Sequence, residues 1–465
     1  MVRRSTFPLV TVVLAIVVVL LGVLSGGRGP VSSTPAEAGA WTTSAATTRS
    51  GTTGSRAVTT SRAAKAKARA KARAKARARA KARAKAKARA KARARARARA
   101  RAKARAKRRR ATATAPTPAT GASTTPIASP MGDAGQPLRF GAYPWGGVGA
   151  IDRVDGARAD DPARAMSAIK ELQGRRQFVV HLYGEYSGTD LGAAERLLSD
   201  ARWWSDHGVG VEAVLRYRPT TSLLGVGFTA WVRSVSAQLA ELRGTVAIQI
   251  GNEANNTASA AAGDGAYAGA VEQIARAIPA ARDAVRAKGR PDVGIGFNWA
   301  ADGSPCTTTR FWTDLRAAGG DAFRAAVDWV GVDVYPGTWS APSRSVTPTA
   351  DAVAETMTST LRCLRTKHLP AAGLGASTTI TVAETGYPTA PGRTEATQTL
   401  VLRSIVEAVS AVRTQYGVTD LRWFGLRDAN TASGQVENGY GLLRDDYSRK
   451  PAFAAFRDVV AATGR

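Results

Sequence analysis

Residues 245–253 read TVAIQIGNE and residues 379–388 read TITVAETGYP, and these two stretches decide the fold that we expect. Each begins as a short apolar run rich in β-branched residues, which predicts a buried strand. Each run then reaches a glutamate, Glu253 in the first and Glu384 in the second. The two stretches therefore predict buried strands that end at acidic side chains.

The same pattern recurs throughout residues 137–465, where apolar strand-like segments alternate with alanine-rich helical segments. The strand candidates are residues 138–144, 177–183, 209–217, 245–252, 293–298, 329–335, 379–384 and 421–426. Clear helical segments are residues 163–172, 193–207, 271–288, 396–416 and 452–462. Eight strand-then-helix units in a stretch of this length predict an α/β fold of the (β/α)8 type, the TIM barrel.

A doubly wound open sheet is the competing topology for alternating strands and helices. It would place a glycine-rich phosphate turn after an early strand. Residues 141–147 read GAYPWGG, which lacks the glycine spacing of that turn and contains a proline. We therefore expect the closed barrel.

The strong basicity of the chain comes from one low-complexity segment. The formal net charge is +31, and residues 62–110, in which Lys or Arg alternates with Ala, hold 26 of the 66 basic residues and no acidic one. Residues 111–465 hold 35 basic and 34 acidic residues, so the expected barrel is close to neutral. Like charges four residues apart repel along a helix, so we expect this polybasic segment to be disordered until an anion neutralises it.

An anionic polymer is the expected partner of the polybasic segment. In an exported protein it would be an acidic envelope polymer, anionic lipid or extracellular nucleic acid, and in a cytoplasmic protein it would be chromosomal DNA. Aromatic residues do not interrupt the run, so base stacking is not indicated and binding should depend on salt. A solvated spacer is the alternative interpretation.

Residues 1–28 have the features of a membrane signal-anchor or a signal peptide. Arg3 and Arg4 precede a largely apolar stretch at 7–24, whose 18 residues reach the short end of the ~17–25 that can span a bilayer. The two arginines favour a cytoplasmic N-terminus and export of the rest. Residues 29–61 and 111–136 have linker composition. We expect a membrane-anchored extracellular or secreted protein of the cell envelope.

In a (β/α)8 barrel the residues at the carboxyl ends of the strands face the active site. Polar and aromatic side chains gather at those positions: Tyr143, Trp145, His181, Tyr183, Glu185, Arg216, Arg218, Asn252, Glu253, Asn298, Trp299, Asp333, Tyr335, Glu384, Tyr387, Trp423 and Arg427. Sugar rings offer flat C–H faces for stacking and hydroxyls for hydrogen bonding. Aromatic residues around carboxylates therefore predict a sugar-binding cleft, in which two carboxyl groups could cleave a glycosidic bond.

The motifs at these strand ends resemble those of a known superfamily. Asn252-Glu253 after the fourth strand and Glu384 after the seventh are similar to the retaining glycoside hydrolases that have (β/α)8 barrels and catalytic glutamates on those two strands. The runs Gly251-Asn252-Glu253 and residues 384–388, ETGYP, most resemble β-1,3-glucanases, with endo-β-galactanases and cellulase or mannanase relatives close behind. Ala254 and Tyr387 depart from the proline and tryptophan typical of these families.

The resemblance implies a role for each matching residue. Glu253 would be the acid/base and Glu384 the nucleophile of a double displacement that needs no cofactor and no metal. Asn252 would bind the sugar 2-hydroxyl, Tyr335 would hold the nucleophile, and Trp423 would stack beneath the reacting sugar. Arg216 would keep Glu384 ionised, since a nearby cation lowers a carboxyl pKa. We expect the substrate cleft to include also Asn298, Trp299, Tyr143, Trp145, His181 and Tyr387.

Other functions remain open or are disfavoured on the sequence. A barrel that binds glycans without cleaving them and a polybasic nucleic-acid-binding protein are the two alternatives. No Gly-x-Ser-x-Gly elbow is present, and no His/Cys cluster has metal-ligand spacing. Cys306 and Cys363 could form a disulfide in an exported protein, but their spacing does not show whether they meet.

Overall fold

The computed structural model describes residues 134–147, 157–188, 192–221, 225, 227–301, 304–307 and 310–465, all within the unit Gly121–Arg465. The predictions for residues 1–28, 29–61, 62–110 and nearly all of 111–136 lie outside the described residues. Within the described part, no helix combines the length and apolarity needed to cross a bilayer. The apolar stretch at 7–24 lies outside that part.

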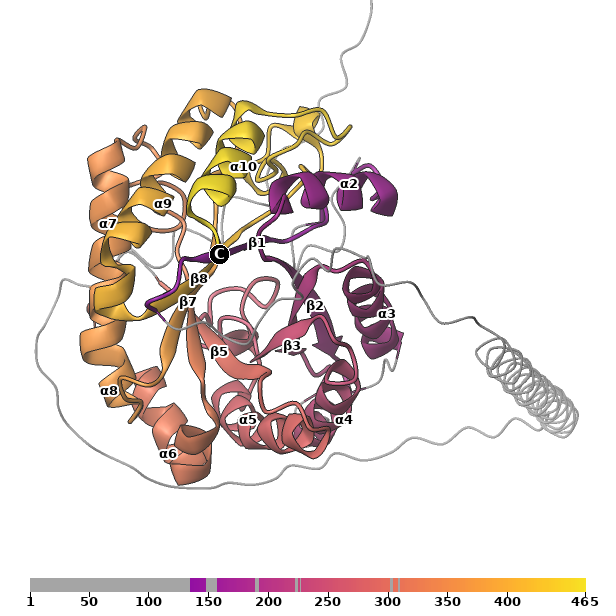
Figure 1. The fold of residues 1–465 in the computed structure, drawn as a ribbon. Helices are drawn as coiled ribbons and strands as arrows, with labels where there is room; N and C mark the ends of the chain where they lie inside the picture. The colour runs from indigo at the N-terminus through magenta and orange to yellow at the C-terminus, as the bar shows by residue number, and fades with distance from the viewer. Residues whose placement is uncertain are drawn as a thin grey trace, which may run out of the picture. The chain divides into compact units, whose positions relative to one another are not determined.

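Eight parallel strands pair in chain order and close on themselves, as β1 hydrogen-bonds to β8 (Figure 1). The strands are β1 Arg139–Ala142, β2 Phe178–Tyr186, β3 Gly210–Tyr217, β4 Thr245–Ile250, β5 Gly294–Ala300, β6 Trp329–Asp333, β7 Thr379–Thr385 and β8 Val418–Trp423. The predicted barrel is confirmed, with each strand starting or ending within a few residues of its predicted bounds.

Helices surround the strands, with α10 between α9 and α2 (Figure 1). The helices are α2 Pro162–Gln173, α3 Gly192–Asp206, α4 Phe228–Leu239, α5 Ala270–Ala287, α6 Arg310–Ala326, α7 Ala350–Cys363, α8 Leu369–Ala371, α9 Glu395–Tyr416 and α10 Pro451–Thr463. Short helical turns are η2 Asp264–Ala266, η3 Leu364–His368, η4 Thr431–Ser433 and η5 Val436–Asn438. The five helical segments predicted from the sequence correspond to α2, α3, α5, α9 and α10.

Local signals in the sequence set the helix ends. The carboxylate of Asp161 accepts hydrogen bonds from the first backbone amides of α2, and Pro162 occupies the first turn, where no amide donor is needed. Thr394 caps α9 in the same way. Gly417 then ends α9 at a φ of 71°, a left-handed conformation that glycine adopts without steric cost.

The main hydrophobic core lies between the barrel and its helices, and includes Phe140, Trp204 and Trp312. A second, smaller cluster contains Val179, Ala247 and Trp329. The indole of Trp329 lies so close to Gly296 that any Cβ at that position would collide with it. A glycine is therefore required at Gly296 for the barrel to pack around this tryptophan.

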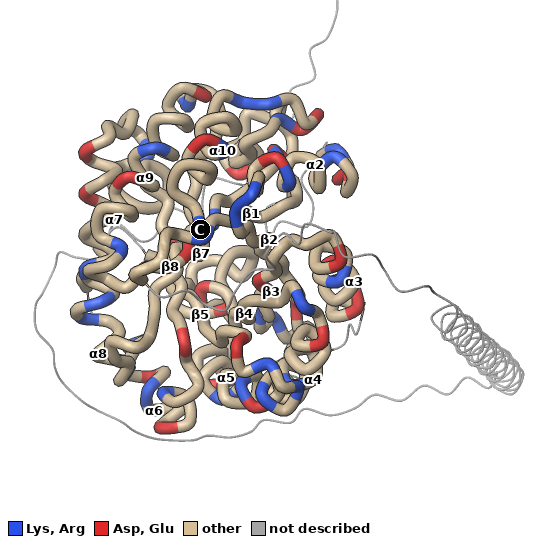
Figure 2. The backbone as a smooth tube through the Cα atoms, viewed as in Figure 1, with Lys and Arg blue, Asp and Glu red and all other residues tan. Residues whose placement is uncertain are grey.

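Cys306 and Cys363, left open by the sequence, form a disulfide with their Cα atoms 5.1 Å apart. The bond joins the connection after β5 to the last residue of α7. Charges of both signs are spread over the described part of the chain (Figure 2). This distribution agrees with the near balance of acidic and basic residues in 111–465.

Candidate active site

The segment that follows β4 places Glu253 at the carboxyl end of the barrel. Gly251 and Glu253 both have positive φ, 78° and 47°. For a glutamate this conformation costs on the order of 1 kcal/mol or more, so neighbouring bonds must hold it. The backbone amide of Glu253 donates to Asn298 Oδ1 at 2.7 Å, and that of Asn252 donates to Asp264 Oδ2 at 2.8 Å.

Glu384 lies near the end of β7 and is 6% exposed. Two phenols hold its carboxylate. Tyr335 donates to Oε2 at 2.7 Å, and Tyr183 donates to Oε1 through a short hydrogen bond. Burial and the charge of Glu384 raise the pKa of both phenols well above the ordinary value, so both remain donors. The phenols fix this carboxylate in one orientation.

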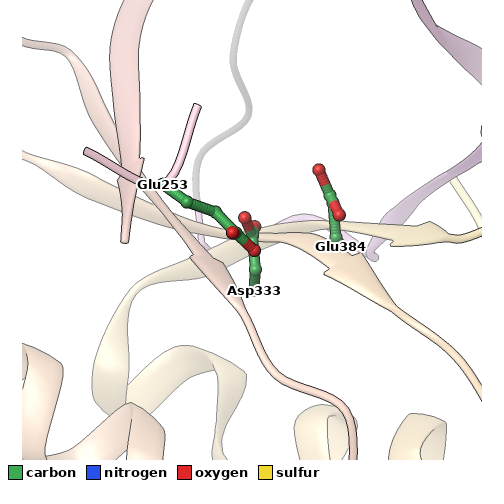
Figure 3. Close-up of side chains that lie close together, drawn as sticks. All are labelled: Glu253, Asp333 and Glu384. Atoms are coloured by element: carbon green, nitrogen blue, oxygen red, sulfur yellow. The ribbon is translucent and has the colours of Figure 1, made fainter. Parts of the chain in front are cut away.

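Three carboxylates converge at the carboxyl ends of β4, β6 and β7, as Figure 3 shows for Glu253, Asp333 and Glu384. One oxygen from each lies within 4.8 Å of the other two. Asp333 is the last residue of β6 and is 2% exposed. Its Oδ2 accepts a hydrogen bond from the amide of Asn298, and its Oδ1 has no partner among the described residues.

Three carboxylates this close cannot all be ionised in a buried site. Burial, and then the charge of Glu384, raise the pKa of Glu253 from the ordinary 4.5 to about 7. Burial and the two glutamates raise the pKa of Asp333 well above its usual range. Both shifts favour the protonated forms, and a pKa of about 7 lets Glu253 exchange a proton readily near neutral pH, which is the property of a general acid/base.

A chain of buried polar groups runs from the barrel interior to Glu384. His181 Nε2 lies 3.0 Å from the Tyr183 hydroxyl, and His181 Nδ1 lies 2.6 Å from Glu212 Oε1. Arg422 pairs with Glu212 at 3.0 Å. Burial alone would raise the pKa of Glu212, but the charge of Arg422 and the hydrogen bond from His181 outweigh it and lower that pKa.

The series of buried polar groups continues below Arg422 through further ion pairs. Arg422 pairs with Asp420 at 2.7 Å, and Arg139 pairs with the same carboxylate at 2.6 Å. All three side chains are buried. Buried charged groups of alternating sign therefore occupy part of the barrel interior, and this column leads up to Glu212 and the carboxyl end of the barrel.

The predicted polar residues on β3 to β5 are held by protein groups. Arg216 pairs with Asp264 at 3.1 Å and lies 3.7 Å from Glu185, and its role in keeping Glu384 ionised stays a prediction. Asn252 gives its amide to Ala262 O at 3.2 Å and accepts a hydrogen bond from Asn298. These residues thus orient the β4 segment, and the charge of Arg216 opposes the rise in the pKa of Glu253.

Three predicted aromatic residues lie in the main core rather than at the carboxylates. Trp299 is 4% exposed and packs against Trp312 and His368 on the helix side. Trp423 is 1% exposed and contacts Phe456 of α10. Tyr387 is 2% exposed, with the guanidinium of Arg393 over its ring at 3.9 Å. The structure does not bring these three rings to the carboxylate cluster.

Other rings take the places near the carboxylates. A cluster of Tyr335, Phe424 and Tyr440 packs with Tyr143 and Tyr183. Sequence reasoning placed Tyr143, Tyr183 and Tyr335 at this end of the barrel and missed Phe424 and Tyr440. Trp145 is partly buried against Trp204, and with Tyr143, Phe424, Tyr440 and Arg427 it lines a shallow hollow beside this cluster.

Oxygen ligands of the kind that Glu253, Asp333 and Glu384 provide suit hard cations such as Mg²⁺ or Ca²⁺. A cation at Glu384 would compete with the two phenols, since each carboxylate oxygen already accepts one hydrogen bond. The raised pKa of the other two carboxyl groups also disfavours ligation, which requires the ionised form. The donors around the cluster therefore fit carboxyl chemistry better than a metal centre.

Comparisons with known proteins give structural neighbours alone, because no family model and no curated protein matches the chain. One neighbour is a fungal β-1,4-galactanase structure, with a TM-score of 0.48, 16% identity and coverage of 69% of this chain and 99% of that chain. A second is GH5_18 from Streptomyces cattleya in complex with GlcNAc, with a TM-score of 0.49, 17% identity and coverage of 70% of this chain and 80% of that chain. A third is Ruminococcus gnavus β-glucuronidase, with a TM-score of 0.46, 13% identity and coverage of 71% of this chain and 50% of that chain. This chain therefore spans about half of the length of that enzyme.

Proposed function

We propose that the barrel is a retaining β-glycosidase in which Glu384 is the nucleophile and Glu253 the acid/base. One observation carries the proposal: carboxylate oxygens from the ends of β4 and β7 lie within 4.8 Å of each other. Retaining glycosidases need carboxyl groups roughly 5–5.5 Å apart, whereas inverting enzymes need about 6.5–9.5 Å to admit a water. The different environments of the two groups support the assignment of roles.

The proposed reaction has two displacements. Glu384 attacks the anomeric carbon while Glu253 gives its proton to the leaving glycosidic oxygen, so a covalent glycosyl-enzyme forms and the alcohol departs. Glu253, now ionised, takes a proton from water as the water oxygen attacks the same carbon, and Glu384 leaves as a carboxylate. The hydrogen bonds from Tyr183 and Tyr335 stabilise that carboxylate whenever it is charged.

Sugar release tests this proposal. The full chain, purified in detergent, is incubated with β-glucans, galactans, mannans and xylans, beside Glu253→Ala and Glu384→Ala. Release by the wild type and its loss in both variants is the expected result, and the first-formed product should have the β configuration by NMR. An α product would refute retention. No release from any polymer, with binding of one of them preserved in all three proteins, would instead support a glycan-binding barrel.

Azide separates the two roles. On an aryl β-glycoside with an activated leaving group, Glu253→Ala still forms the glycosyl-enzyme because that leaving group needs no proton. Azide should then attack the intermediate and give a β-glycosyl azide. In Glu384→Ala azide replaces the nucleophile and should give the α-glycosyl azide. The opposite pattern would reverse the assignment of the two glutamates.

We further propose that the polybasic segment 62–110 holds the enzyme against an anionic envelope polymer or lipid. The support is compositional: 26 positive charges and no negative charge in one run, joined to a nearly neutral remainder. Counterion release makes such binding steeply dependent on salt. A variant without residues 62–110 should leave cell envelopes at lower salt than the full chain. Equal retention of both proteins across a salt series would refute the role, and cleavage of the barrel by protease in intact cells would confirm export.

A further inference from the structure

The connection after β6 forms a compact loop, residues 334–340, beside the carboxylate cluster. The backbone amides of Thr338, Trp339 and Ser340 all donate to the carbonyl of Tyr335, at 3.0–3.1 Å. The hydroxyl of Ser340 accepts from the amide of Tyr335 and donates to Ala301 O at 3.0 Å. These bonds tie the loop to the residue whose phenol holds the nucleophile.

A buried arginine fastens the other side of this loop. Arg393 is 9% exposed and donates to Gly337 O at 3.0 Å, to the hydroxyl of Thr338 and to Pro388 O at 3.2 Å. Its guanidinium also lies over the ring of Tyr387. The loop is therefore held by the connection after β7 as well as by the end of β6, and it presents its side chains in fixed positions.

Trp339, at the outer end of the loop, is nevertheless 49% exposed. Among the described residues, the other exposed large hydrophobic side chains are Val346, at 57%, and Leu400, at 40%. Exposed apolar surface costs roughly 25 cal/mol for each Å² that could have been buried, and a small or polar residue would avoid the cost. A fixed loop that displays an indole needs an explanation beyond packing.

Hydrogen bonding also fixes the orientation of this indole. Trp339 Nε1 donates to the hydroxyl of Tyr440 at 2.7 Å, and Arg344 lies over the indole at 5.7 Å from its centroid. One edge of the ring is thus bonded and one face is covered by a guanidinium. The exposed part of the ring is flat, apolar and held in place, which are the properties that a sugar-stacking residue requires.

Two tyrosines connect Trp339 to the nucleophile. The ring of Tyr440 lies 5.6 Å from that of Tyr335, and the Tyr335 hydroxyl bonds to Glu384. A sugar bound at Glu384 would lie against this pair of tyrosines. The indole is hydrogen-bonded to the hydroxyl of Tyr440 and so lies one ring farther from Glu384. That is where we expect the next sugar of an oligosaccharide to pass.

We infer that Trp339 is the stacking platform of a second sugar subsite, so that the substrate is an oligosaccharide or polysaccharide rather than a small monoglycoside. The inference rests on the proposed function, since the chain of contacts ends at the proposed nucleophile. It adds a specificity residue that lies outside the catalytic cluster and that the strand-end motifs did not indicate.

The test compares substrates of different length with Trp339→Ala in the full chain. kcat/KM is measured for an aryl monosaccharide glycoside and for oligosaccharides of two to five units of the same sugar. Loss of one aromatic stacking contact should reduce kcat/KM about tenfold for the substrates that reach the subsite. The aryl monosaccharide should be unaffected within twofold. Trp339→Phe should recover part of the loss, because it keeps an aromatic face without the N–H bond.

Val346→Ala is the matched control, because it removes an exposed hydrophobic side chain from the same connection between β6 and α7. It should leave all substrates unchanged. Equal loss on every substrate in Trp339→Ala would show that the indole acts on the catalytic centre through Tyr440, and no loss on any would show that it binds no sugar. Either result overturns the inference.

Failure of the proposed function gives a different result, since the wild type itself would then cleave no substrate. Calorimetric titration of the full chain with the same oligosaccharides still tests Trp339 in that case. Weaker binding of the longer oligosaccharides to Trp339→Ala than to the wild type would support the sugar subsite even though the barrel is not an enzyme. Equal binding by wild type and variant would refute the subsite as well as the enzyme.

Discussion

The substitution Asn256→Ala tests the electrostatics of the proposed acid/base directly. Asn256 donates its amide to Glu253 Oε2 at 2.8 Å. This bond favours the ionised carboxylate and so opposes the effects of burial and Glu384, which raise the pKa of Glu253 to about 7. Removing the donor should raise that pKa further, because only the charged form loses stabilisation.

The expected magnitude follows from the wild-type value. The first displacement needs protonated Glu253, so kcat/KM should fall about tenfold for each pH unit above 7 and reach about one-hundredth of its plateau at pH 9. A hydrogen bond to a charged group contributes about 1.5–3 kcal/mol, and one pH unit corresponds to about 1.4 kcal/mol. Asn256→Ala should therefore move the basic limb upward by about 1–2 pH units.

The assay is kcat/KM from pH 4 to 10 at constant ionic strength, on an aryl β-glycoside whose poor leaving group requires the proton. Ser259→Ala is the control, because the Ser259 hydroxyl accepts a bond from Ala262 in the same loop and does not bond to Glu253. Its profile should match the wild type. A limb that stays in place or moves downward in Asn256→Ala would refute the reasoning, as would a wild-type limb below pH 5.5.

Tyr335→Phe removes a hydrogen bond to the charged carboxylate of Glu384, which contributes about 1.5–3 kcal/mol, and should slow hydrolysis of the glycosyl-enzyme about 10- to 150-fold. A larger burst of product and a glycosyl-enzyme detected by intact mass spectrometry would show this slower step. Unchanged turnover would contradict the prediction. Asp333→Asn should keep kcat within about threefold at pH 7, because burial and the two neighbouring glutamates raise the pKa of Asp333 and so favour its neutral form; a hundredfold loss would mean that its charge is used. Replacement of both Cys306 and Cys363 by alanine should lower the free energy of unfolding by about 4 kcal/mol, because the unfolded chain is no longer closed into a 57-residue loop. Urea titration of wild type and variant, with and without reductant, measures this difference, and equal free energies of unfolding would contradict the prediction.

The barrel could be predicted because its signal repeats. Each strand is a short apolar run with its own helix, and eight such units specify the topology even where one boundary is displaced by a few residues. The disulfide could not be predicted, because it depends on how the connection after β5 approaches the end of α7. That approach is a property of the packed helix layer, which local sequence patterns do not specify.

Strand alternation explains which aromatic residues were placed correctly. On β8, Asp420 and Arg422 face the charged barrel interior, so Leu421 and Trp423 face the helices and Phe424 faces inward again. On β5 the amide of Asn298 faces the carboxylates, so Trp299 points outward. The alternating polar residues 420 and 422 carried this signal. The role that the resemblance implied for Trp423 did not take this alternation into account.

The buried column behind Glu384 is better explained by positioning than by stability. Buried ion pairs contribute little net stability compared with apolar residues of the same volume. Tyr183 has one proton and gives it to Glu384, so its oxygen can only accept from His181 Nε2. The opposite nitrogen faces Glu212, whose lowered pKa keeps it an acceptor. His181 thus lies between Glu212 and Tyr183 and orients the phenol that donates to Glu384. Arg422 compensates the charge of Glu212 from below, so the column holds the imidazole and the phenol in fixed positions behind Glu384.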